Sequence, residues 1–106
     1  MGDARETDDA AGGSDGRKER HRLDKWLWCS RFYKTRSLAA QAISGGKAHL
    51  NAERVKPAHI VRIGDVVSVV LNGVVAEFVV RGLPARRGPA EEARQHYAET
   101  DASAQR

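Results

Sequence analysis

The spacing of apolar residues predicts two helices in the first half of the chain. Apolar residues recur at i, i+3 and i+4 between positions 23 and 30, which is typical of a short amphipathic helix. Thr35 is a favourable N-cap residue, and an apolar stripe runs from there through Ile43. Gly45 and Gly46 then end the second helix. We therefore expect two short helices joined by a brief connection.

After these glycines, apolar residues alternate with polar ones, which is the period of a strand. Extended segments are expected at 47–51, 54–56, 60–63, 66–71 and 74–81. A turn at 51–53 joins the first two segments as a small hairpin. Asn72-Gly73 joins the last two and is a strong hairpin signal. The sheet is therefore expected to be antiparallel at least in that part.

The C-terminal part of the chain is interpreted as a loop followed by one surface helix. Pro89 suits a helix start, and mostly polar residues follow, so a helix is expected over 89–99. The chain after Thr100 is expected to fray. Together these patterns predict an α+β fold, with two short helices packed on a small, mainly antiparallel sheet. This is a helix-helix-hairpin arrangement with an additional C-terminal helix.

Positive charge is concentrated in one block of the chain. Residues 17–62 hold twelve basic residues against three acidic ones, whereas the whole chain has 18 Lys and Arg against 14 Asp and Glu. Such a block concentrates phosphate, so we expect a polyanionic partner, although a solvated basic face is the alternative. Residues 1–17 are acidic and glycine-rich and are expected to form a disordered tail. We expect a binding domain at 18–82 and a C-terminal extension at 83–106.

The chain lacks the sequence motifs of common catalytic sites. It contains no phosphate-binding loop of the GxxxxGK[ST] type, no HExxH zinc motif and no GxSxG nucleophile elbow. Its single cysteine, Cys29, has no CxxC neighbour and is expected to be a small buried residue. We expect no enzymatic activity, no cofactor and no metal. No apolar run reaches the roughly 18 residues of a membrane span, and no signal segment is found, so a cytoplasmic protein without membrane contact is expected.

Residues 22–57, RLDKWLWCSRFYKTRSLAAQAISGGKAHLNAERVKP, resemble the RNA-binding module first recognised in ribosomal protein number four of the small subunit. With the positions that follow, the chain resembles the bacterial fifteen-kilodalton heat-shock protein family from Arg22 to Thr100. The positions that carry the resemblance are Arg22-Leu23-Asp24, Arg31, Lys34-Thr35-Arg36, Gly46-Lys47, Asn51, Arg54 to Pro57, and then Pro89, Ala93, Tyr97 and Thr100.

This resemblance implies a ribosome-associated RNA-binding protein, with its RNA-binding domain at 18–82. It implies recognition of large ribosomal subunits obstructed by peptidyl-tRNA after stress, in rescue or recycling. The implied partners are ribosomal RNA, the large subunit and peptidyl-tRNA, with weak DNA binding and a monomeric state off the ribosome. A second interpretation is a quality-control factor that stabilises tRNA during tail addition. A third is a general nucleic-acid-binding or basic protein-adaptor module.

The candidate RNA-binding residues are mostly basic side chains of the two helices and the predicted hairpin. Arginine offers a planar fork to phosphate oxygens and lysine a mobile point charge. The candidates are Arg22, Lys25, Arg31, Lys34, Thr35, Arg36, Lys47, His49, Asn51, Arg54 and Lys56. Thr35 has two compatible roles, as a helix cap and as part of a phosphate site at the helix start. Structured RNA is favoured over DNA because a helix and a hairpin suit a shallow minor groove.

The aromatic residues near the first helix leave two interpretations open. Trp26 shares the apolar face of that helix and is expected in the core. Trp28 lies about 200° further around the helix, so it cannot face the same core and is expected to be exposed. Phe32 and Tyr33 either stack on RNA bases or pack between the two helices, and whether Trp28 stacks on a base or packs in the core is also left open.

Overall fold

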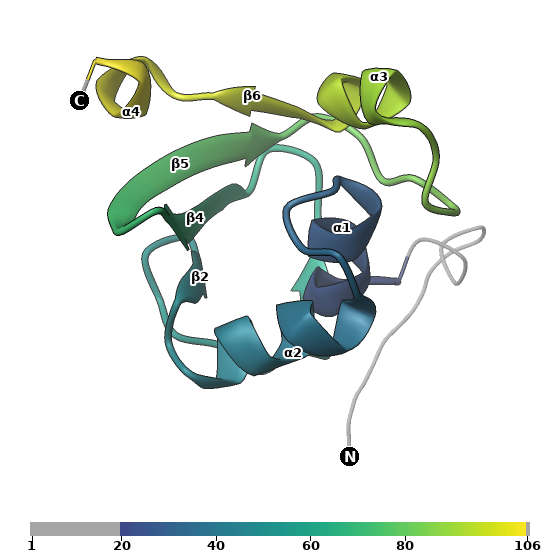
Figure 1. The fold of residues 1–106 in the computed structure, drawn as a ribbon, viewed down its shortest axis with the longest axis horizontal. Coiled ribbons are helices and arrows are strands. Elements are labelled where there is room, and N and C mark those ends of the chain that lie inside the picture. The colour runs from purple at the N-terminus through teal and green to yellow at the C-terminus, as the bar shows by residue number, and fades with distance from the viewer. Residues whose placement is uncertain (1–19, 106) are drawn as a thin grey trace.

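A computed structural model describes residues 20–105, and the acidic segment 1–17 lies outside the described residues. The elements are β1 (His21–Arg22), α1 (Leu23–Cys29), α2 (Arg36–Ser44), β2 (Ala48–Leu50), β3 (Ile60–Val61), β4 (Val66–Leu71), β5 (Val74–Val80), α3 (Ala90–Ala93), the 3₁₀ turn η2 (Arg94–His96), β6 (Tyr97–Glu99) and α4 (Asp101–Ala104). Figure 1 shows α1 and α2 beside the sheet that contains β4 and β5. The predicted α+β class, with helices on a mainly antiparallel sheet, is confirmed.

Both predicted helices form, and both end in the same backbone motif. At the end of α1, Phe32 N donates to Leu27 O at 3.0 Å and Arg31 N donates to Trp28 O at 3.0 Å. This is the Schellman pattern, and its C′ residue requires the left-handed region, which Arg31 adopts with φ 69°. At the end of α2 the same position is held by Gly46, with φ 80°. Glycine is the usual residue at this position, so Arg31 is placed there against its backbone preference.

The predicted hairpin of 47–51 with 54–56 is wrong beyond its first turn. Leu50 and Glu53 form a single bridge, after which the chain leaves the sheet. β2 instead pairs antiparallel with β4, with Ala48 opposite Val69 and Leu50 opposite Val67. The six-residue, valine-rich β4 offers this strand a partner with apolar residues on the matching face, which the short polar segment 54–56 does not.

β4 and β5 form the predicted hairpin, and their inner face carries the core. Asn72 and Gly73 have φ values of 53° and 80°, as a type I′ turn requires. The four-stranded sheet has the order β2-β4-β5-β6, while β1 and β3 form a separate two-stranded sheet. The buried residues of both sheets pack with those of α1 and α2 in one cluster. This core cluster is made of Leu23, Trp26, Leu27, Ala39, Ile43, Ala48, Leu50, Val61, Val67, Val69, Phe78 and Val80.

The helix predicted over 89–99 is wrong in its second half. α3 ends at Ala93, η2 follows, and residues 97–99 form β6 on the free edge of β5. Tyr97 lies opposite Val80, so the aromatic ring reaches the core side of the sheet, which a surface helix would not allow. The pairing also satisfies the edge of β5, which would otherwise present unpaired backbone groups.

The fraying predicted after Thr100 is also wrong. The Thr100 side chain caps α4 by accepting from Ser103 N at 3.2 Å. The buried Ser103 hydroxyl accepts from Glu77 N at 2.9 Å and donates to Glu99 at 2.7 Å. These contacts tie α4 to β5 and β6. Among residues 20–105, no helix has the length and apolar character needed to cross a bilayer.

Candidate nucleic-acid interface

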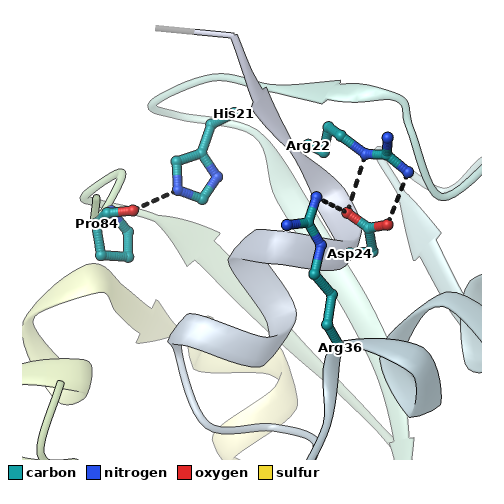
Figure 2. A network of polar contacts seen from close by, with 5 residues as sticks. All are labelled: His21, Arg22, Asp24, Arg36 and Pro84. Carbon is teal, nitrogen blue, oxygen red and sulfur yellow. Dashed lines mark hydrogen bonds and ion pairs between the residues drawn. The ribbon is translucent and has the colours of Figure 1, made fainter. Parts of the chain in front are cut away.

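Two arginines converge on one buried carboxylate at the start of α1 (Figure 2). Asp24 is 4% exposed. Arg22 donates to it twice, from Nε at 3.2 Å and from Nη2 at 2.9 Å, and Arg36 donates once, from Nη2 at 3.2 Å. The side chains of Arg22 and Arg36 remain 48% and 43% exposed. Asp24 therefore fixes two guanidinium groups at the surface, and this trio keeps a net positive charge.

The segment that follows the bridge at Glu53 carries a third cation past the start of α1. Asp24 N donates to Pro57 O at 3.1 Å and Leu23 N donates to His59 O at 2.9 Å, so this segment satisfies amides at the start of α1. Lys56 precedes Pro57 and is exposed. The three cations Arg22, Arg36 and Lys56 are named here the first cationic group.

A second cationic group lies at the other end of α2. Arg54 Nη2 donates to the carbonyl oxygen of Ser44, the last residue of α2. Its guanidinium carbon lies 3.5 Å from the position that a side-chain carbon at Gly46 would occupy. Lys47 follows Gly46 directly and is exposed. Arg54 and Lys47 thus sit together, and a cation near the carbonyl end of a helix is favoured by the helix dipole.

α2 sets the separation of the two groups. Its nine residues make eight steps of about 1.5 Å, so Arg36 and Ser44 are held about 12 Å apart along the helix. The chain from Arg54 to Pro57 leads from one end of α2 to the start of α1, so both groups share one rigid frame. We call the five residues Arg22, Arg36, Lys47, Arg54 and Lys56 the cationic surface.

Thr35 caps α2 as predicted. Its hydroxyl accepts from Leu38 N at 3.0 Å, and its backbone is extended. The first amides of α2, those of Arg36 and Ser37, have no partner within the helix, as at any helix start.

Two predicted site residues, Asn51 and His49, do not lie with the cationic surface. Asn51 adopts φ 52°, donates to Asp65 at 3.2 Å and accepts from Val66 N at 2.9 Å, so its side chain holds the start of β4. His49 lies opposite Ser68, on the face of β2 that alternates with the buried residues Ala48 and Leu50. That is the sheet face turned away from the helices.

The remaining predicted cations flank the cationic surface. Lys25 lies half-buried on α1, and Lys34 is exposed in the connection before α2. Arg31 is exposed and donates from Nη1 to Gly88 O at 2.9 Å, which directs its side chain toward the C-terminal segment.

The structure shows where the aromatic residues near α1 lie. Trp26 is fully buried, as predicted. Phe32 packs in the core, with ring centroids 4.8 Å from those of Phe78 and Tyr97, so packing rather than stacking on RNA describes it. Burial raises the pKa of the Tyr33 phenol above its ordinary value. Cys29 is buried, as predicted.

Sequence reasoning missed the contacts of segment 82–88 with β1 and α1. His21 Nε2 lies 2.6 Å from Pro84 O, and Trp26 Nε1 donates to Gly82 O at 2.9 Å. Arg87 Nε donates to Trp28 O at 3.0 Å. These pairs are 56 to 63 residues apart in the chain, and no local pattern signals them. Within residues 20–105, no group of three or more His, Cys, Asp or Glu side chains is arranged to hold a metal ion.

Comparison with known proteins agrees with this architecture. The sequence pattern of the S4 domain family matches residues 21–67, which span β1 to the first part of β4. The chain therefore contains an S4 domain, and the cationic surface lies entirely inside it.

Two heat shock protein 15 relatives match this chain over a longer stretch than the S4 domain. Heat shock protein 15 of Escherichia coli strain K12 is 42% identical over 85 residues, which is 80% of this chain and 64% of that protein. The heat shock protein 15 homolog of Aeromonas salmonicida is 46% identical over 82 residues, covering 77% of this chain and 62% of that protein. The chain thus spans slightly less than two thirds of the length of these relatives.

A solved structure gives the same result in three dimensions. The trimeric structure of Vibrio cholerae heat shock protein 15 superposes with a TM-score of 0.77 at 43% identity, covering 79% of this chain and 85% of that one. The chain belongs to the heat shock protein 15 family.

Proposed function

We propose that this protein binds structured RNA through the cationic surface. The observation that carries this proposal is the arrangement of its two cationic groups at the two ends of α2. Asp24 orients Arg22 and Arg36 of the first group, and the carbonyl end of α2 holds Arg54 of the second. Oriented guanidinium groups bind phosphate with less ordering cost than free side chains, because their conformation is already set.

The shape of the surface favours an RNA backbone over base edges. The cations lie at the ends of short helices and strands and on the segment between Arg54 and Pro57, and within residues 20–105 no long helix or ribbon projects from them to enter a deep groove. Such a surface contacts phosphates and 2′-hydroxyls across the shallow minor groove of an RNA helix. Phosphate contacts position a protein without reading sequence, so we expect weak sequence preference.

The finer proposal is that the RNA belongs to the large ribosomal subunit. It is supported by membership of the heat shock protein 15 family, and it extends to subunits obstructed by peptidyl-tRNA after stress. In this proposal the protein acts by binding in the cytoplasm and catalyses no reaction.

Sedimentation with purified ribosomal subunits tests this proposal. The protein is pelleted with large subunits, small subunits and large subunits carrying peptidyl-tRNA, at near-physiological salt. Preferential pelleting with the tRNA-carrying large subunit is expected. Lys47→Gln should reduce pelleting, whereas Arg94→Gln, which removes an equally exposed charge in η2 outside the S4 domain, should not. Equal pelleting with every particle would reduce the proposal to general RNA binding.

Two alternatives make different predictions in the same system. A quality-control factor that stabilises tRNA during tail addition would bind the obstructed subunit and also extend the lifetime of the tRNA on it. A basic adaptor for an acidic protein would show no preference for RNA over heparin. Competition of structured RNA against heparin at equal charge concentration separates the adaptor from both RNA-binding proposals.

A further inference from the structure

Trp28 occupies an unusual place on α1. Trp26 is fully buried and donates from Nε1 to Gly82 O at 2.9 Å, whereas Trp28 is only partly buried. The aromatic ring pairs among residues 20–105 join Trp26, Phe32, Phe78 and Tyr97, and Trp28 takes part in none of them. A tryptophan outside the aromatic core keeps part of its ring available at the surface.

One arginine is fixed beside this ring. The guanidinium carbon of Arg87 lies 5.9 Å from the Trp28 ring centroid, within the range of a cation–π contact. Its Nε donates to Trp28 O at 3.0 Å and its Nη2 reaches Tyr33 O at 3.5 Å. Two backbone carbonyls therefore hold the guanidinium plane. The ion pairs among residues 20–105 all involve Asp24, so no carboxylate there neutralises Arg87.

Further positive charge surrounds this pair. Lys25 lies one helical turn before Trp28, at the i−3 position on the same side of α1. Arg86 is exposed next to Arg87. Burial raises the pKa of the nearby Cys29 thiol, and the charges of Lys25, Arg36 and Arg87 act in the opposite direction. Asp24, which pairs with Arg36, lies on α1 four residues before Trp28 and therefore on the same side of the helix, so this area adjoins the first cationic group.

We infer that Trp28 and Arg87 form a stacking site for one unpaired nucleobase of the RNA held by the cationic surface. The inference rests on the proposed RNA binding. It makes the ligand more specific: an RNA helix that continues into a single-stranded segment. Partly exposed aromatic rings and arginine planes stack on bases of any sequence, because every base has a π-face. A purely structural pair, which only fastens segment 82–88 to α1, would not respond to unpaired nucleotides.

Binding of two matched RNAs tests the stacking site. One RNA is a blunt hairpin and the other is the same hairpin with a short single-stranded overhang. Trp28→Leu should weaken binding of the overhang RNA by about 5-fold or more. A factor of about 5 is the lower end of the range expected when one aromatic–base stack is lost. Binding of the blunt hairpin should not change. Trp28→Phe keeps an aromatic ring and should retain most of the affinity, which makes it the matched control.

Fluorescence of the unaltered protein gives a second readout that does not depend on any variant folding. The overhang RNA should quench the emission of the partly exposed Trp28, and the blunt hairpin should not. In Trp28→Phe only the buried Trp26 remains, and the quenching should disappear.

The outcomes separate this inference from the proposed function. If the overhang RNA neither binds more tightly than the blunt hairpin nor quenches the tryptophan emission, the stacking site is refuted while RNA binding stands. The stacking site is likewise refuted if Trp28→Leu, with an unchanged unfolding midpoint, binds the overhang RNA as the unaltered protein does. If neither RNA binds the unaltered protein, the proposed function itself fails.

Discussion

Because Arg22 and Arg36 share the buried carboxylate of Asp24, we expect their contributions to the free energy of unfolding to be non-additive. The perturbation is Arg22→Gln, Arg36→Gln and the double variant. In each single variant one guanidinium still pairs with Asp24, whereas in the double variant a carboxylate whose side chain is 5% exposed loses both of its ion-pair partners. Removal of the last partner of a buried charge is strongly destabilising, because the uncompensated charge stays out of water.

The structure sets the expected magnitudes. Arg22 makes two hydrogen bonds to Asp24 and Arg36 makes one. A hydrogen bond to a charged group contributes about 1.5–3 kcal/mol, and the partial exposure of both arginines reduces this to about 1 kcal/mol for each single variant. The double variant should lose about 3–5 kcal/mol, the usual cost of an unpaired buried charge. The coupling between the two sites is therefore about 1–3 kcal/mol.

Urea unfolding of the four proteins measures this coupling. Lys34→Gln serves as the control, because this exposed lysine forms no ion pair with the described residues, and its unfolding free energy should change by less than about 0.5 kcal/mol. An additive double variant, with a total loss below about 2 kcal/mol, would contradict the reasoning, since Asp24 would then not depend on the two cations.

Three further predictions concern the fold around the site. Burial lowers the pKa of His21 below its ordinary value of 6.5, so the folded state binds fewer protons than the unfolded state. The contribution of neutral His21 to the free energy of unfolding should therefore be complete above pH 6.5 and decrease as the pH falls below that value. Between pH 7.5 and pH 5, the free energy of unfolding measured in urea should fall less in His21→Gln than in His59→Gln. Arg31→Gly relieves a left-handed residue and should raise the unfolding free energy by about 0.5 kcal/mol while weakening RNA binding, and an equal or lower stability would contradict the assigned strain. Ser103→Ala leaves Glu77 N without its partner and should cost about 1–2 kcal/mol by the same assay, so a loss near zero would show that α4 does not fasten the sheet.

The parts of the fold that follow local pattern could be predicted from the sequence. The i, i+3, i+4 spacing around Trp26 gave α1, the Thr35 cap began α2, and Asn72-Gly73 joined β4 to β5. In each case the deciding residues lie within one element or one turn, so their preferences act without help from the rest of the chain.

β6 could not be predicted in this way. Residues 97–99 are too few for a strand period, and they follow a helix start in the sequence. Their extended conformation comes from pairing with the edge of β5 and from the contact of Tyr97 with Phe78, at 5.3 Å between ring centroids. Such long-range pairing overrides local preference.

The candidate site was predicted in composition but not in arrangement. The basic block correctly indicated Arg22, Arg36 and Lys47 as surface cations. Asp24 entered the sequence analysis only through the family resemblance, and its burial between two arginines depends on how α2 packs on α1.

The salt dependence of RNA affinity tests the central claim most directly. If the cationic surface contacts four to six phosphates, the logarithm of affinity for a structured RNA should fall against the logarithm of salt with a slope of about −3 to −4 or slightly steeper. Lys47→Gln should flatten the slope by about one contact's share, whereas Arg94→Gln should leave it unchanged. Equal slopes for both variants and the unaltered protein, with the fold intact, would show that RNA is not bound at this surface.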